Sequence, residues 1–124
     1  MRKVILFLFL GLFITGCATL PTSKEMATAD YGQYPDNYNE IVQNWINDTF
    51  FDPYSVRDLT ISTPQKYYIS EAPLMGGRRY FGYYVSVTCN AKNRMGGYVG
   101  KQTSNLFIRN GIIIKQWKEG EFPY

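Results

Sequence analysis

The chain has 124 residues, enough for one small domain and too few for a second independent core. It carries 13 Lys and Arg against 10 Asp and Glu, and setting aside Arg2 and Lys3 at the N-terminus reduces the 13 to 11. This near-neutral body excludes a nucleic-acid-binding protein, which needs a concentrated basic field. Because the chain has no His, it also lacks the commonest general base and the commonest zinc ligand. We expect no metal and no cofactor.

The first residues have the pattern of a secretory signal. A positively charged start is followed by an apolar run over residues 4–14 and then by Thr15-Gly16-Cys17. The apolar run is too short to cross a bilayer, which takes about 20 residues. The sequence therefore predicts a signal peptide over residues 1–16.

Residues 14–17, Ile-Thr-Gly-Cys, resemble the lipobox of bacterial lipoproteins. The resemblance implies cleavage before Cys17, a diacylglycerol thioether on its sulfur, and an acyl chain such as palmitate on its amino group. Several acyl chains anchor a protein stably in a membrane. Ala18, in place of Asp, implies the periplasmic side of the outer membrane, with the inner membrane as the alternative. The other interpretation is that Cys17 is an incidental thiol behind an ordinary signal peptide.

The segment after Cys17 differs in composition from the rest of the chain. Residues 18–35 are rich in Thr, Ser, Ala, Gly and Pro and show no apolar periodicity. Such a composition predicts that residues 17–35 form the lipidated cysteine and a flexible tether. One small domain over residues 36–124 follows.

The first element predicted in this domain is an amphipathic helix that starts after Pro35. Asn37 and Glu40 fit a capping box, and the Asp52-Pro53 pair disfavours continuing the helix past that point. Between these limits, side chains at helical spacing form one apolar stripe: Tyr38, Ile41, Val42, Trp45, Ile46 and Thr49.

Strands are predicted for the remainder of the chain. The predicted strands cover residues 56–62, 67–70, 79–90, 98–109 and 112–114, with an Asn110-Gly111 hairpin turn before the last. The alternation of apolar and polar residues is irregular over residues 98–109, which predicts a β-bulge at Gly100. The predicted fold class is α+β, with one N-terminal amphipathic helix packed on an antiparallel meander of about four or five strands.

The strand over residues 79–90 has the clearest alternation. One side is expected to face the core and consists of Phe81, Tyr83, Val85, Val87 and Cys89. Since free cysteine is among the most buried residue types, Cys89 is interpreted as a small core residue.

No catalytic residue is expected, because the carboxylates are dispersed and nothing points to an acid with a raised pKa. The stretch 76–79, Gly-Gly-Arg-Arg, lacks the ending of a phosphate-binding loop. Tyr80 and Tyr84 share the outward side of the strand over residues 79–90 and, with Arg78 and Arg79, form a candidate interface, since aromatic and Arg side chains often anchor interfaces. The alternative is that the tyrosines only shield the second face of the sheet.

Two stretches together resemble a group of small, mostly uncharacterised bacterial envelope proteins. They are residues 52–56, DPYSV, and residues 90–100, NAKNRMGGYVG. The resemblance covers about residues 36–109 and brings no activity with it. In physical terms, the glycines permit positive φ angles and the asparagines can bond local backbone groups.

Three functions remain open at this point. The first hypothesis is a lipid-anchored, periplasm-facing binding or scaffold module of an envelope assembly, such as a biogenesis or secretion complex. The partners would then be the membrane, through the lipid, and an envelope protein. The alternative is a stand-alone ligand binder or hydrolase inhibitor at the cell wall, and the weakest is a cell-wall enzyme.

Overall fold

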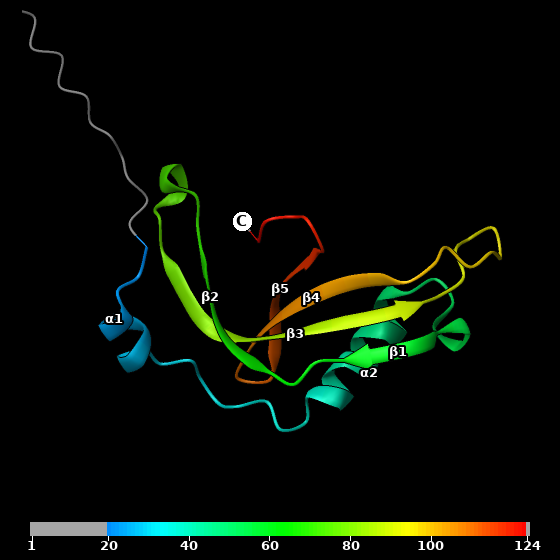
Figure 1. The fold of residues 1–124 in the computed structure, drawn as a ribbon, viewed down its shortest axis with the longest axis horizontal. Helices are drawn as coiled ribbons and strands as arrows, with labels where there is room; N and C mark the ends of the chain where they lie inside the picture. The colour runs from blue at the N-terminus through cyan, green and yellow to red at the C-terminus, as the bar shows by residue number, and fades with distance from the viewer. Residues whose placement is uncertain (1–19, 124) are drawn as a thin grey trace, which may run out of the picture.

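The computed structural model describes residues 20–123, so the predicted signal and Cys17 lie outside the described residues. The fold is α+β with an antiparallel five-stranded sheet, which confirms the predicted α+β class and the antiparallel sheet (Figure 1). In chain order, the elements are helices α1 (Ser23–Thr28) and α2 (Tyr38–Thr49), 3-10 turns η1 (Pro53–Ser55) and η2 (Pro73–Met75), and strands β1 (Arg57–Ile61), β2 (Gln65–Ser70), β3 (Arg79–Asn90), β4 (Gln102–Arg109) and β5 (Ile112–Lys118).

Strand β3 organises the sheet because its length of about 40 Å allows it to pair with two strands on one edge. β1 and β2 lie end to end along that edge, with Ile61 opposite Val87 and Gln65 opposite Tyr84. β4 pairs with the other edge of β3, and β5 pairs with β4. The sheet is therefore a meander of four positions, the first of which is filled by two short strands.

Helix α2 covers part of one face of the sheet with two fully buried side chains, Val42 and Ile46. The other buried members of this core cluster are Val85, Val87, Leu106 and Ile108. The capping box predicted from Asn37 and Glu40 is wrong, because the Asn37 side chain makes no cap hydrogen bond. Its ψ angle of 26° departs from the extended conformation that carries a capping side chain over the first turn.

The hairpin between β4 and β5 has the predicted turn. Asn110 and Gly111 have φ angles of 50° and 78°, as a type I′ turn requires. This turn sets β4 and β5 side by side, with Arg109 opposite Ile112.

The strand predicted from residue 98 begins instead at Gln102, and the bulge predicted at Gly100 is wrong. Gly100 lies in the preceding loop with a φ of 94°, and its backbone N–H donates to Asn90 Oδ1 at 3.1 Å. That bond joins the two ends of the loop over residues 91–101, so residues 98–101 belong to the loop and not to the strand. The register shift lies later, between Phe107 and Ile108 in the pairing of β4 with β5.

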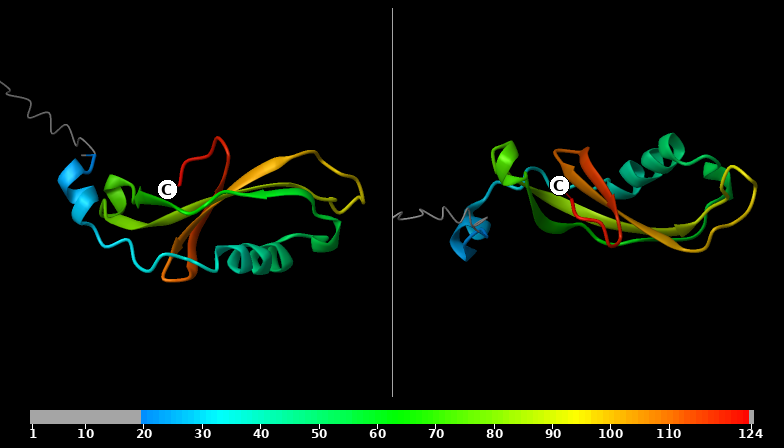
Figure 2. Two further views of the ribbon diagram at one scale, coloured as in Figure 1. Left: turned by 60° about the horizontal axis from the view of Figure 1, so that its bottom comes forward. Right: turned by 90° about the horizontal axis from the view of Figure 1, so that it is seen from above.

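Residues 23–35, which the sequence assigns to the tether, lie against the sheet. Thr22 caps α1 by accepting a hydrogen bond from the Glu25 amide at 3.1 Å. The contacts that hold the segment include the ion pairs Arg79–Glu25 at 2.9 Å and Arg109–Asp30 at 3.2 Å, and the edge-on rings of Tyr31 and Phe81 at 5.5 Å. The tether prediction did not account for these pairings with distant strands. Helices α1 and α2 lie toward opposite ends of the sheet (Figure 2).

The face of the sheet opposite α2 carries an aromatic cluster. The Tyr67 ring contacts those of both Tyr84 and Trp117, with centroid distances of 4.9 and 5.9 Å. Phe107 is fully buried edge-on to Tyr67. A Cβ atom on Gly82 would lie 2.8 Å from the Phe107 ring, so the absent side chain of this glycine makes room for the ring.

Candidate functional site

The four residues of the predicted interface do not form one surface. Tyr80 and Tyr84 share the face opposite α2, but the Tyr80 hydroxyl donates to Glu71 Oε1 at 2.7 Å. This hydrogen bond, together with burial and the Glu71 charge, raises the pKa of Tyr80. Arg79 lies on the other face, where it pairs with α1. Arg78 is exposed, and its nearest carboxylate oxygen belongs to Glu71, at 3.9 Å from Nε.

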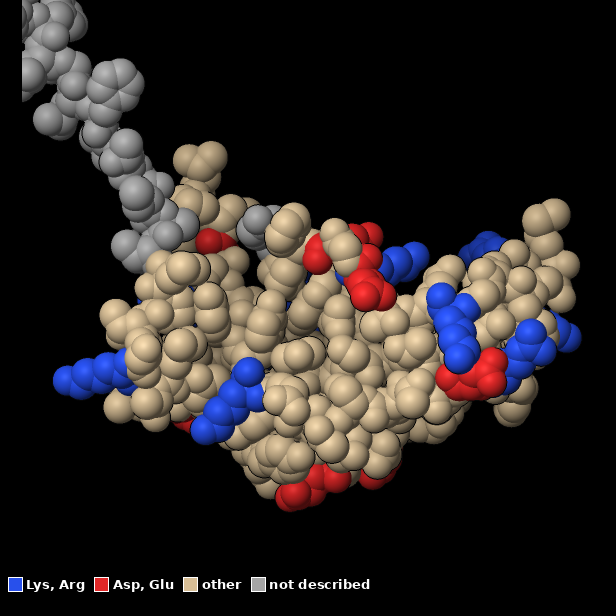
Figure 3. Space-filling view, viewed as in Figure 1, with Lys and Arg blue, Asp and Glu red and all other residues tan. Residues whose placement is uncertain are grey.

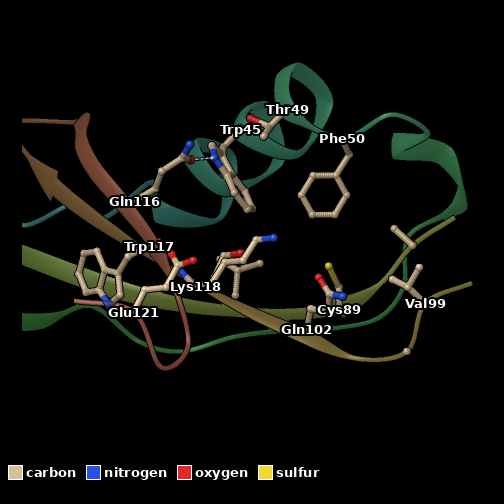
Figure 4. A pocket seen from close by; sticks show the side chains of 14 residues that line it. Trp45, Thr49, Phe50, Cys89, Val99, Gln102, Gln116, Trp117, Lys118 and Glu121 are labelled. Carbon is tan, nitrogen blue, oxygen red and sulfur yellow. Dashed lines mark hydrogen bonds between the residues drawn. The ribbon is translucent and has the colours of Figure 1, made fainter. Parts of the chain in front are cut away.

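A pocket of about 320 Å³ opens on the face of the sheet that carries α2, beside the C-terminal half of this helix (Figure 4). This volume is at the low end of the range for ligand sites, about 300–1,000 Å³. α2, β3, β4, β5 and the loop over residues 91–101 all contribute to its walls. The pocket therefore brings together segments that are far apart in the sequence.

The floor of the pocket is built from two cross-strand pairs of small or flexible side chains. Val87 lies opposite Ser104, and Cys89 lies opposite Gln102. α2 ends at Thr49, so the helix covers the neighbouring part of the sheet face and leaves this part open. The hollow exists because small floor residues coincide with the end of the covering helix.

Aromatic side chains form the wall on the α2 side. Trp45 and Phe50 contact each other edge-to-face with 5.3 Å between ring centroids. The Trp45 indole N–H donates to Gln116 Oε1 at 2.6 Å, which connects α2 directly to β5. Because this bond fixes the indole, the wall is preorganised.

The opposite wall comes from the end of β5 and the turn after it. There, the Lys118 backbone N–H donates to Glu121 Oε2 at 3.0 Å, so the carboxylate folds back onto the strand end. Trp117 also borders the pocket, yet its ring stacks on Tyr67 on the far face of the sheet. The pocket thus has an apolar aromatic side and a polar side.

Cys89 is 5% exposed on the floor, and burial raises the pKa of its thiol. Its interpretation as a buried residue is confirmed. A protonated thiol is a weak nucleophile. We therefore describe Cys89 as part of the binding surface of the pocket.

This thiol gives a testable pH dependence. The raised pKa means that the folded chain keeps the thiol proton at a pH where the unfolded chain has lost it. The unfolded state then binds fewer protons, so stability falls as the pH rises above the pKa of an ordinary thiol. We expect the urea midpoint to fall more between pH 8 and pH 10 in the wild-type chain than in Cys89→Ser, which removes this thiol. An equal fall in both chains would contradict burial of the thiol.

The pocket was not predicted from the sequence. Its floor depends on the register that sets Cys89 beside Gln102, and the sequence predicted β4 with the wrong start. Small residues in neighbouring strands were the available signal, but they line one hollow only when the pairing is known.

Among residues 20–123, no group of three or more His, Cys, Asp or Glu side chains is placed to hold a metal ion. In the same part of the chain, no helix combines the length and apolar character needed to cross a membrane. Comparisons with protein-family models, with curated proteins and with solved structures find no match to this chain.

Proposed function

We propose that the chain is a lipid-anchored binding module of the bacterial envelope that holds an apolar side chain of a partner protein in the pocket beside α2. The observation that carries this proposal is the pocket itself, with about 320 Å³ of space between the aromatic pair Trp45–Phe50 and the polar end of β5. A pocket of this size suits a single side chain or a similar small group better than a large cofactor.

The polar groups around the pocket favour a protein segment as the ligand. Gln102, Gln116 and Ser104 offer amide and hydroxyl groups, which can hydrogen-bond a peptide backbone in both directions. Gln116 accepts from Trp45 through its oxygen, so its NH₂ group is still able to donate. A partner segment could therefore bury an apolar side chain in the pocket while its backbone forms hydrogen bonds with these polar groups at the rim.

The anchor belongs to the same proposal. A lipid on Cys17 would hold the domain at the periplasmic face of the outer membrane, where its partner would be an envelope protein. We expect the wild-type chain to incorporate labelled palmitate in cells and Cys17→Ala to incorporate none. The role proposed for the domain is binding, with no catalytic step.

Photo-cross-linking in cells tests the binding site directly. A photo-reactive phenylalanine analogue at position 102 would project into the pocket, whereas at the neighbouring position 103 it would project from the opposite face, where Thr103 contacts Thr88. We expect a defined envelope protein to be cross-linked from position 102 and not from position 103.

A second variant tests whether the cross-link from position 102 depends on the open space of the pocket. Ser104→Leu places an apolar side chain on the pocket floor and is expected to abolish the cross-link from position 102 while the domain stays folded. Equal cross-linking from positions 102 and 103, or a cross-link that survives Ser104→Leu, would contradict the proposed site.

A further inference from the structure

The two stretches that carry the family resemblance meet at one end of the sheet. Lys92 N–H donates to Ser55 Oγ at 2.8 Å, and the Tyr98 hydroxyl donates to the Ser55 carbonyl at 2.9 Å. Within the loop, Asn93 Oδ1 accepts from the amides of Met95 and Gly97 at 3.0 and 3.2 Å. These bonds fix the loop over residues 91–101 against η1.

This rigid end presents apolar side chains to solvent. Tyr54 is 99% exposed, Met95 is 93% exposed and Phe51 is 64% exposed. Large apolar side chains held outward on a fixed scaffold often mark an interaction site. Because their backbone is already ordered, binding through them would cost little further entropy.

Three cationic side chains contact aromatic rings at the same end of the sheet. Arg94 lies 5.9 Å from the Phe51 ring, and both Arg57 and Lys92 lie over the Tyr98 ring, at 3.6 and 5.5 Å. Blue side chains gather at this end in Figure 3, next to a red group. We call Phe51, Tyr54, Arg57, Lys92, Arg94 and Met95 the basic tip. The acidic residues on the same segments are Asp52 and Asp58.

We propose that the basic tip docks on an anionic lipid surface. Exposed aromatic and apolar side chains flanked by Lys and Arg match the boundary between lipid headgroups and acyl chains. Three cationic side chains against the carboxylates of Asp52 and Asp58 leave a net charge of +1, which attracts anionic headgroups, and the apolar side chains can enter the layer beneath them.

The basic tip lies at the opposite end of the domain from the segment that leads to Cys17. β3 separates the tip from α1 and residue 20, where the segment that leads to Cys17 begins (Figure 1). Contacts at both ends with one membrane would lay the domain along its surface. This orientation is independent of what the pocket binds.

The test uses the full lipidated chain in vesicles, with an environment-sensitive fluorophore at a single site. Met95→Cys carries the fluorophore on the tip, and Asn47→Cys carries it on the exposed side of α2 as the matched control. Both variants also contain Cys89→Ser. The vesicles contain phosphatidylcholine with brominated acyl chains, which quench a fluorophore that reaches them, either alone or with about 30 mol% phosphatidylglycerol.

In vesicles with phosphatidylglycerol, we expect quenching at position 95 to exceed quenching at position 47 by on the order of threefold. Lys92→Glu with Arg94→Glu, or about 0.5 M NaCl, should remove the difference, because both weaken the attraction to anionic headgroups. Circular dichroism and the thermal transition of the charge variant show that it remains folded.

Two results would overturn the proposal. One is equal quenching at positions 95 and 47, or quenching at position 95 that does not depend on phosphatidylglycerol. The other is retention of the chain on isolated peptidoglycan sacculi through Lys92 and Arg94 without quenching in vesicles, which would assign the tip to glycan carboxylates.

Discussion

Replacing Phe107 by alanine is expected to lower the free energy of unfolding by about 3–5 kcal/mol. The ring is fully buried, lies against Gly82 and is edge-on to Tyr67. Since Gly82 has no side chain that could move into the space, the truncation leaves a cavity. Urea denaturation monitored by circular dichroism measures the loss.

Phe51→Ala is the matched control for this substitution. Phe51 is 64% exposed, so its truncation is expected to change the free energy of unfolding by less than about 0.5 kcal/mol. Similar losses for Phe107→Ala and Phe51→Ala would contradict the placement of Phe107 in the sheet.

Gly82→Ala is expected to lower the free energy of unfolding by about 1–3 kcal/mol. An added Cβ would lie 2.7 Å from the Ile108 carbonyl oxygen and 2.8 Å from Phe107 Cζ, closer than such atoms approach without movement. The control is Gly97→Ala, because a Cβ there has its nearest neighbour at 4.0 Å. Urea denaturation of the two variants gives the comparison.

The double variant Gly82→Ala with Phe107→Ala separates the clash with the Phe107 ring from the clash with the Ile108 carbonyl oxygen. In Phe107→Ala the ring atom is gone, but the Ile108 carbonyl still lies 2.7 Å from the added Cβ. Gly82→Ala should therefore cost less in that background than in the wild-type chain, without becoming neutral. Strict additivity would mean that the ring does not occupy the space above Gly82.

Local signals in the sequence predicted several elements correctly. The Asn110-Gly111 turn follows from the two positive φ angles that its residue types allow. The alternation in β3 placed Val85, Val87 and Cys89 on the buried face, because strand periodicity depends only on neighbouring residues.

Features that depend on distant partners were not predictable in the same way. Tyr31 lies in a segment of polar composition, and its burial comes from Phe81 and Tyr83, some fifty residues later in the chain. The predicted interface does not form one surface, and part of the reason is local. Strand periodicity alone puts Arg79 on the face opposite Tyr80, and the pairing of Arg79 with Glu25 required the position of α1.

The pocket needed the most long-range information. Its floor requires the register of β3 with β4, its aromatic wall requires the position at which α2 ends, and its polar wall requires the turn after β5. The sequence predicted a start for β4 that is four residues too early, ended the last strand at residue 114 and predicted no turn after it. The combination was therefore visible only in three dimensions.

Disulfide exchange at Cys89 tests the central claim, that the pocket binds an apolar group. The full chain is equilibrated with mixed disulfides of 2-phenylethanethiol and 2-mercaptoethanol, and mass spectrometry measures which thiol is attached. Burying a phenyl group is worth about 1.5–3 kcal/mol, so we expect the aromatic thiol to be preferred by about tenfold or more. The preference should disappear in Ser104→Leu and at an exposed cysteine in Met75→Cys with Cys89→Ser. Equal attachment of both thiols to wild-type Cys89 would contradict the account.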